Sequence, residues 1–372
     1  MEKHIICLFI NSSIYFNIDM NNEFKIILEN IENSLNAALP QSCSTDTGWK
    51  QVSFGTLPAG AKDEYIDKLL EPNKRLVSLG GKRWRPLLLM LCYKMCAEKS
   101  NKAGSPALTE EQAYSITPLV EFVHTASLIH DDIEDSADLR RGKPAAHITY
   151  GLDTALNAGS WLYFEAPVCI NRLNVAEALK LRLYETYTNE LRRLHLGQAM
   201  DIYWHRNPDF FPMEEEYLAM VKNKTGTLAS LAAKLGCIAG GLSIEEAEKF
   251  GGIAADIGIG FQIIDDVINL TTGNPGKERG DDIVEGKKSL PVLIHAGLCP
   301  DDKPKIAEFM KAAATGGIHS PAVEDCIALL NTSGCIQKAA ERGRELIEQS
   351  CAQFHSQQIQ ELFTSMIPEN FR

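Results

Sequence analysis

The segment HTASLIHDDIEDSADLRRG, residues 124–142, decides how the rest of the chain is interpreted. Apolar residues between Leu119 and Leu128 recur at helical spacing and lead into its acidic part. Asp131 and Asp135 are four residues apart, so both carboxylates lie on one face of the predicted helix. Because two like charges at this spacing repel each other, a cation is expected between them. The segment therefore predicts an α-helix that ends in a cation-binding pair of carboxylates.

The residues around this pair favour magnesium bound together with a phosphate group. Carboxylate oxygens are hard ligands, and Mg²⁺ keeps several waters and usually bridges to the phosphates of a substrate. Arg140 and Arg141 follow the expected helix end, where their guanidinium groups can bind phosphate oxygens bidentately. Taken alone, an acidic cluster of this kind is equally typical of a solvated helix face.

A second acidic cluster strengthens the functional interpretation. The segment GFQIIDDVINL, residues 260–270, repeats the spacing with Asp265, Asp266 and Asn269 at the end of another apolar helical pattern. Two such clusters, each on an otherwise apolar helix, are expected to face each other across a pocket. The pair of segments predicts a site for a diphosphate and its metal.

In these motifs the chain resembles the trans-prenyl diphosphate synthases, all-helical enzymes that join isopentenyl diphosphate to an allylic diphosphate. The resemblance covers about residues 55–295 and keeps the family order. The motifs are GGKRWRP at 80–86, the first aspartate-rich motif with RRG, GQAMD at 197–201, KTG at 224–226, the second aspartate-rich motif, and GDDIVEGKKSLP at 280–291. Any one of these motifs is a weak signal, whereas six in the same order are a strong one.

The resemblance also implies roles for individual residues. Asp131, Asp135 and Asp265 would hold Mg²⁺, while Asp132 and Asp266 would orient ligands and waters behind them. Lys224 and Thr225 would act on the allylic substrate and its developing cation. Isopentenyl diphosphate would bind to Lys82, Arg85, His124 and Arg141, and the allylic diphosphate to Arg140, Lys224, Thr225, Gln262 and Lys277.

The implied reaction is a chain elongation driven by ionisation. The allylic diphosphate leaves, the double bond of isopentenyl diphosphate attacks the allylic cation, and a proton is lost. Ala126 and Ser127, five and four residues before Asp131, are small where short-chain relatives often have aromatic residues. A product of C20 or longer is therefore expected, and geranylgeranyl diphosphate is favoured.

Two other functions are weighed against this one. A class I terpene cyclase shares the DDxxD motif and the all-α fold, but it would normally carry an NDxxSxxxE-like second motif and would not need GGKRWRP. A non-catalytic partner subunit of a prenyl synthase is the other alternative. Asn269 stands where many relatives have a third aspartate, yet both acidic clusters are otherwise intact, which argues against a non-catalytic role.

Helical periodicity without alternating strand patterns predicts an all-α, single-domain bundle with a central substrate cavity. We expect residues 1–45 to form an N-terminal extension, helical from about residue 23, and residues 46–372 to form the synthase domain. Met20 is a candidate initiator. Residues 41–60 are predicted to be a loop by their Ser, Thr and Gly content, and residues 214–233 to be one helix.

Composition limits the class of protein. The chain has 372 residues, a net charge of −12 and no extended basic run, which argues against nucleic acid as the main partner. The longest apolar run near the N-terminus, Ile5 to Ile10, is far shorter than a membrane span. Ten dispersed cysteines without a CxxC pair favour a reducing compartment, most simply the cytoplasm. The resemblance adds the expectation of a homodimer.

Overall fold

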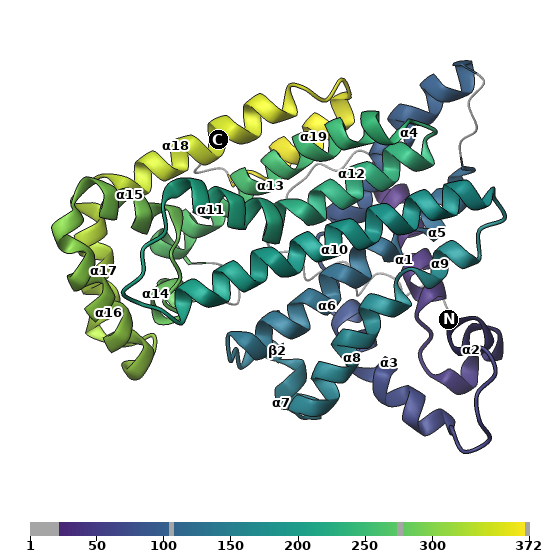
Figure 1. Ribbon diagram of the computed structural model, residues 1–372, viewed down its shortest axis with the longest axis horizontal. Coiled ribbons are helices and arrows are strands. Elements are labelled where there is room, and N and C mark those ends of the chain that lie inside the picture. Colours follow the sequence, from purple (N-terminus) through teal and green to yellow (C-terminus); the bar gives the residue numbers. More distant parts are fainter. Residues whose placement is uncertain (1–21, 104–107, 274–277, 369–372) are drawn as a thin grey trace.

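The computed structural model describes residues 22–103, 108–273 and 278–368. Helices form most of this part, as Figure 1 shows, and the expected all-α fold is confirmed. The strands within the described residues are two short ones, β1 (Leu139–Arg140) and β2 (Lys143–Pro144), which pair antiparallel. They form the hairpin that follows the first acidic motif.

The helices follow one another along the chain with short connections. Their bounds are α1 (Asn22–Ala38), α2 (Thr47–Phe54), α3 (Asp63–Ser78), α4 (Trp84–Ala103), α5 (Glu110–Ser115), α6 (Pro118–Glu134), α7 (Ala146–Tyr150), α8 (Leu152–Glu165), α9 (Val168–Asn171), α10 (Glu177–His205), α11 (Glu214–Val221), α12 (Thr227–Ala239), α13 (Ile244–Thr271), α14 (Asp281–Val284), α15 (Leu290–Leu298), α16 (Lys303–Gly316), α17 (Pro321–Asn331), α18 (Cys335–Cys351) and α19 (Gln357–Met366). Short 3₁₀ turns lie at Cys43–Thr45 and Pro300–Asp302, and a π-helical turn lies at Lys222–Gly226.

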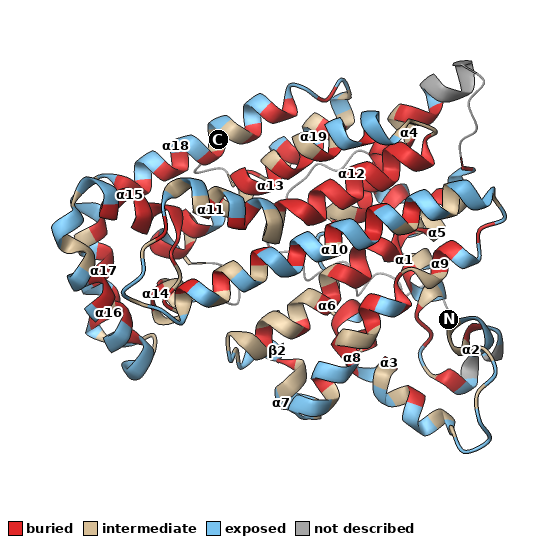
Figure 2. Ribbon diagram, viewed as in Figure 1, coloured by how far each residue is buried: buried red, intermediate tan, exposed pale blue. Residues whose placement is uncertain are grey.

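Helix α12 lies at the centre of the bundle. Every one of its residues is buried, and it packs against α4, α10 and α13. Its sequence is apolar on all sides, as expected for a helix surrounded by other helices. A Cβ atom placed on Gly236 would lie 2.3 Å from the carbonyl oxygen of Leu89, so α12 and α4 touch through their backbones. Figure 2 shows this buried centre, with exposed residues confined to the outer helices.

Helix α1 is part of the same core. Phe24, Ile27, Ile31 and Leu35 recur at helical spacing, and all four side chains are buried among residues of α4 and α6. The described portion of the predicted N-terminal extension is therefore packed into the bundle. The suggested start at Met20 lies outside the described residues.

Two local predictions are wrong. Residues 41–60 are not a continuous loop, because α2 forms there with Asp46 as its N-cap: the Asp46 carboxylate accepts the backbone N–H of Trp49 at 2.8 Å. The Trp49 side chain is buried and holds the short helix against the core. The predicted helix 214–233 is interrupted by the π-helical turn Lys222–Gly226, which separates α11 from α12.

Candidate active site

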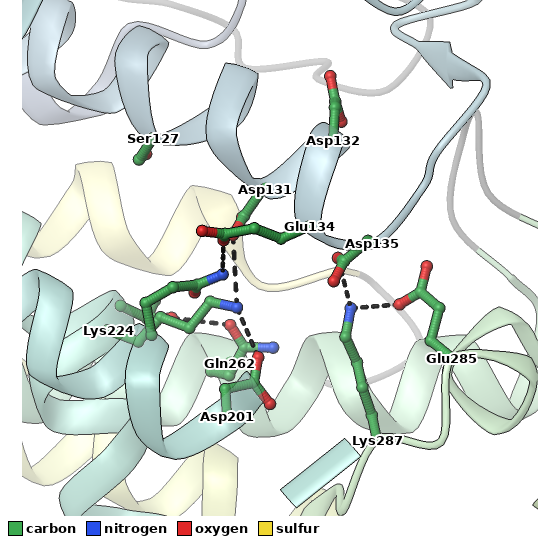
Figure 3. A network of polar contacts seen from close by, with 12 residues as sticks. Ser127, Asp131, Asp132, Glu134, Asp135, Asp201, Lys224, Gln262, Glu285 and Lys287 are labelled. Atoms are coloured by element: carbon green, nitrogen blue, oxygen red, sulfur yellow. Dashed lines mark hydrogen bonds and ion pairs between the residues drawn. The ribbon is translucent and has the colours of Figure 1, made fainter. Parts of the chain in front are cut away.

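The first acidic motif lies at the carboxyl end of α6. Asp131 and Asp135 point toward α10 and the π-turn, whereas Asp132 points away from them (Figure 3). Asp132 is buried and accepts a hydrogen bond from Nε of Arg140 at 2.8 Å. The two carboxylates that the spacing argument put on one helix face therefore point to the same side of α6. Arg140, predicted to bind the allylic diphosphate, is here engaged by Asp132.

Lys224 connects the first motif to α10. Its Nζ atom lies 2.6 Å from a carboxylate oxygen of Asp201 and 3.6 Å from one of Asp131. Burial lowers the pKa of Lys224, but the two carboxylates outweigh it, so the pKa is raised overall. Burial likewise raises the pKa of Asp201, and Lys224 and Lys287 outweigh it in the opposite direction. The lysine is thus a permanent cation held over Asp131.

Thr225 connects the same turn to the second acidic motif on α13. Its hydroxyl donates to Oε1 of Gln262 at 2.9 Å, and Nε2 of Gln262 donates to Asp266 at 3.0 Å. Asp266 also accepts hydrogen bonds from the Tyr217 hydroxyl and the Leu290 backbone N–H, and its burial raises the pKa of this carboxyl to about 6. A continuous chain of contacts therefore runs from Asp131 to the second motif.

Asp265 is the exposed carboxylate of the second motif. It lies close enough to Lys82 to raise the pKa of that lysine, although burial lowers it by more. Asn269 is buried instead, and its side-chain oxygen accepts the backbone N–H of Asp282 at 3.3 Å. The side chain at the third aspartate position therefore holds the first turn of α14.

A second cluster, which we call the cationic pocket, lies beside the turn between α3 and α4. It encloses about 230 Å³ and contains four predicted residues. A guanidinium nitrogen of Arg85 lies 3.4 Å from Nε2 of His124, and the guanidinium of Arg141 donates to the carbonyl oxygen of Gly80. The residues that line the pocket are Gly81, Lys82, Arg83, Trp84, Arg85, Glu121, His124 and Arg141.

The electrostatics of the cationic pocket suit an anion. The pKa of Arg85 is lowered to about 10, mainly by burial; Glu121 opposes this change, and the nearby Arg141 contributes to it. Burial also lowers the pKa of His124 well below its usual value, together with the charge of Arg85. The buried Nε atom of Arg85 has no hydrogen-bond partner in the described structure. An oxyanion in the pocket would supply both the acceptor and the countercharge.

The backbone of the GGKRWRP turn explains how these groups converge. Gly80 and Gly81 have φ angles of 76° and 149°, which residues with side chains rarely adopt. The guanidinium of Arg83 is turned inward, where it pairs with Glu121 at 2.6 Å and Glu32 at 2.7 Å. Arg83 is thus a structural residue, and its neighbours Lys82 and Arg85 remain available to the pocket.

Lys287 is the main site residue missing from the predicted set. Its Nζ lies 3.4 Å from Asp135 and also contacts Glu285, as Figure 3 shows. Burial lowers the pKa of Lys287, but the surrounding carboxylates hold it well above its usual value. The motif GDDIVEGKKSLP was the sequence signal for this residue. Lys277, which was predicted to close over the diphosphate, lies outside the described residues.

The aspartate motifs fit a divalent cation that shares its coordination with a ligand. Asp131 and Asp135 offer hard carboxylate oxygens, which in this structure contact the ammonium groups of Lys224 and Lys287. Within the described residues, the aspartates of the two motifs do not bring three ligand atoms close enough together to enclose an ion. His295, Cys299 and Asp302 do lie that close, but both ring nitrogens of His295 already have hydrogen-bond partners. All-oxygen ligands with open positions suit a hard ion completed by water and diphosphate oxygens.

Comparison with known proteins gives a consistent result. A family model described as polyprenyl synthetase matches residues 66–326. A geranylgeranyl pyrophosphate synthase of Aspergillus flavus is 34% identical over 278 residues, which are 73% of this chain and 75% of that protein. One from Apiospora sacchari is 37% identical over 238 residues, 63% of this chain and 66% of that protein. The crystal structure of geranylgeranyl pyrophosphate synthetase from Pyrococcus horikoshii superposes with a TM-score of 0.74 at 26% identity. The match covers 92% of this chain and 95% of that chain.

Proposed function

This chain belongs to the polyprenyl synthetase family of trans-prenyltransferases, and we propose that it joins isopentenyl diphosphate to an allylic diphosphate. The product is a trans-prenyl diphosphate of C20 or longer, with geranylgeranyl diphosphate favoured. The observation that carries this proposal is the pairing of a cationic site for one diphosphate with a carboxylate-rich site that suits a diphosphate bound together with a metal. One is the cationic pocket, and the other is the network of Asp131, Lys224 and Asp201 beside it.

The two sites divide the substrates. Lys82, Arg85, His124 and Arg141 hold the diphosphate of isopentenyl diphosphate, because they line a pocket whose one carboxylate, that of Glu121, is already paired with Arg83. The allylic diphosphate lies between the aspartate motifs, where Lys224, Thr225 and Gln262 reach it. Arg140, which donates a hydrogen bond to Asp132, and Lys277 are proposed to bind the same diphosphate.

The side chains of the site favour separation of charge in the allylic substrate. Lys224 and Lys287 bring positive charge to the leaving diphosphate, and the hydrogen-bonded pair Thr225 and Gln262 places oxygen dipoles beside the developing allylic cation. The π electrons of isopentenyl diphosphate then form the new carbon–carbon bond. A proton leaves the adjacent carbon of the condensed product, and the departed diphosphate is its acceptor.

Enzymes of this family use a divalent metal, and we propose that Mg²⁺ is the ion here. Asp131, Asp135 and Asp265 would hold it, since their oxygen ligands suit a hard cation. When bound, the metal neutralises the diphosphate and makes it a better leaving group. The apolar residues around the site exclude water, which would otherwise capture the allylic cation.

A homodimer is proposed from an unpartnered apolar face. On α8 the large apolar side chains of Leu152, Leu156 and Phe164 are exposed, and that of Phe164 is 77% exposed. Leu181 and Leu196 extend the apolar surface along α10. Apolar patches of this kind mark interfaces between protein chains. A second copy of this chain would bury the same residues on both sides, as a two-fold interface requires.

The proposed compartment is the cytoplasm. The described cysteines are all free, and most of them are buried in the core as ordinary apolar residues, as in the case of Cys92 and Cys96. Within the described residues, no helix has the length and apolar content needed to cross a membrane.

One assay tests the proposed function and its alternatives. Purified protein is incubated with Mg²⁺, labelled isopentenyl diphosphate and each allylic diphosphate in turn, and the chain length of the product is measured. We expect incorporation of label into a C20 or longer product. Cyclisation of an allylic diphosphate without incorporation would identify a class I terpene cyclase. Activity seen only after a related synthase is added would identify a partner subunit.

A further inference from the structure

We propose that Gly197 and Gly258 are positioning residues that set where Lys224 and Thr225 stand in the active site. The inference deepens the proposed function and rests on it, because Lys224 and Thr225 act there on the allylic diphosphate. The two glycines lie on α10 and α13, on either side of the π-turn Lys222–Gly226. Neither glycine carries a functional group, so their contribution is one of space.

Gly197 lets the π-turn lie directly on the backbone of α10. A Cβ atom at position 197 would lie 2.3 Å from the backbone nitrogen of Lys224 and 2.7 Å from its Cα atom. Real Cβ atoms essentially never come this close, and the atoms in question belong to the backbone, which cannot swing aside. Asp201, one helical turn further along the same face, receives Nζ of Lys224 at 2.6 Å.

Gly258 has the same relation to the turn from the side of α13. A Cβ atom there would lie 2.9 Å from the Cα atom of Gly226. Gly226 is itself confined, since its own Cβ would lie 2.9 Å from the carbonyl oxygen of Ala255. Gln262, one turn after Gly258, accepts the hydroxyl of Thr225 at 2.9 Å.

Both helices therefore repeat one arrangement, in which a glycine admits the turn and a residue four positions later binds a side chain of the turn. A π-helical turn has poorer intrinsic stability than an α-helical one, and such turns occur often at functional sites. Here the two helix backbones hold the turn in register. Any methyl group added at 197 or 258 must displace the turn, and Lys224 would then move relative to Asp131.

The effect should be confined to the allylic half of the site. The cationic pocket is lined by residues of the α3–α4 turn, the first turn of α4, α6 and Arg141, and no residue of the π-turn is among them. Displacement of Lys224 therefore leaves the isopentenyl diphosphate site intact. A general loss of structure would affect both substrates, which distinguishes positioning from a merely structural role.

The test is steady-state kinetics of Gly197→Ala and Gly258→Ala with each substrate varied in turn. We expect kcat/KM for the allylic diphosphate to fall by about 10- to 100-fold, since misplacement of a catalytic group by about 1 Å has effects of that size. KM for isopentenyl diphosphate should stay within about 2-fold of the wild-type value. Unchanged allylic kinetics in both variants, or an equal rise of both KM values, would overturn the inference.

Two matched variants serve as controls. Gly252→Ala lies on the same helix as Gly258, but its Cβ would meet no atom within 4 Å, so it should leave the kinetics unchanged. Gly236 is as tightly confined as Gly197, since an added Cβ atom would lie 2.3 Å from the carbonyl oxygen of Leu89. Gly236→Ala, however, affects the contact between α12 and α4 and not the π-turn. It should lower the melting temperature without changing the ratio of the two KM values.

A double-mutant cycle provides the second readout. In a Lys224→Ala background, Gly197→Ala should lower kcat/KM for the allylic diphosphate far less than it does in the wild type. The side chain that the substitution displaces is already absent there. Additive losses would contradict the proposal. If Gly197→Ala does not fold, Gly258→Ala, where the contact is less close, decides the question through the same kinetics. Inactive wild-type protein would refute the proposed function itself, whereas an active wild type with unaffected glycine variants refutes this inference alone.

Discussion

Lys224 shows how much of the site depends on a single charge. Its ammonium group lies between Asp131 and Asp201, and the Asp201 side chain is only 8% exposed. Lys224→Ala would remove the contact proposed to the leaving diphosphate and leave the buried Asp201 carboxylate without its nearest cation. We expect kcat/KM for the allylic diphosphate to fall by about 10²- to 10³-fold, as for loss of a preorganised electrostatic group.

The same variant makes a prediction about acid stability. The pKa of Asp201 is lowered in the folded protein, so this carboxylate stabilises the fold above its unfolded pKa, and the contribution is lost as the pH falls through the folded value. Lys224→Ala should remove much of this contribution, which makes unfolding by acid begin at a higher pH. Far-UV circular dichroism during an acid titration measures the shift. Lys222→Ala, which removes an exposed lysine of the same turn, is the control.

The proposed control of product length also rests on single residues. Ala126 lies fully buried on α6, five residues before Asp131. Ala126→Phe adds a ring to the wall along which the growing chain is proposed to pass, and the product should become shorter. Such overpacking of a core costs about 1–3 kcal/mol, so folding must be verified alongside. Chromatography of the dephosphorylated products gives the chain length, and an unchanged length in a folded, active variant would refute this account of length control.

At the scale of elements, regular periodicity was a reliable guide. The apolar pattern between Leu119 and Leu128 predicts a helix that leads into the acidic motif, and α6 (Pro118–Glu134) forms there, because a continuous apolar pattern and a proline in the first turn both act locally. Helix α2 was missed because a short helix depends on one cap and one buried tryptophan, which composition does not reveal. The π-turn was missed because it depends on close packing against Gly197 and Gly258, residues distant in sequence.

Helix α2 therefore allows a test of capping. Asp46→Ala removes the carboxylate that accepts the backbone N–H of Trp49, which should cost about 1 kcal/mol of folding stability. Asp46→Asn keeps an acceptor at the same position and should retain most of that stability. The melting temperatures of the two variants make the comparison, and prenyltransferase activity at 25 °C should be unchanged in both. Equal destabilisation by the two substitutions would mean that the carboxylate acts through its charge and not as a cap.

For the molecule as a whole, the sequence predicted the group of residues at the site better than their contacts. It correctly placed Asp131 and Asp135 on one helix face, since four-residue spacing fixes that relation. It did not anticipate that Asn269 is buried or that Lys287 reaches Asp135, because both depend on how the segment after α13 folds back on the bundle. Local patterns determine helix faces, whereas the pairing of charges requires the tertiary fold.

The proposed dimer is tested at this scale by changing the apolar face of α8. Phe164→Glu places a charge on the most exposed of its apolar side chains, and desolvation of that charge in an interface is unfavourable. Wild-type protein should elute as a dimer in size-exclusion chromatography with light scattering, and the variant should dissociate. Tyr65→Glu, a comparable change at an exposed aromatic residue on α3, is the control. A wild-type monomer at micromolar concentration would contradict the proposal.

Global stability should also depend on pH through one buried lysine. Lys288 is 2% exposed, and burial lowers its pKa to about 8, with Asp209 opposing and Lys311 adding to the shift. Its ammonium group donates to the carbonyl oxygen of Gly286 at 3.3 Å and lies 5.1 Å from the ring of Phe211.

Because the folded pKa of Lys288 is depressed, the unfolded chain binds more protons between about pH 8 and the usual lysine pKa of 10.5, so stability should rise with pH across that window. A shift of this size corresponds to about 3 kcal/mol. Lys288→Met fills the same space without a charge. Near pH 7 its free energy of unfolding should exceed that of the wild type by up to that amount, reduced by the stability that the lost contacts of the ammonium group contributed. The advantage should shrink toward pH 10. Denaturant unfolding of both proteins at pH 7 and pH 9.5 measures it, and a difference independent of pH would show that Lys288 does not carry this titration.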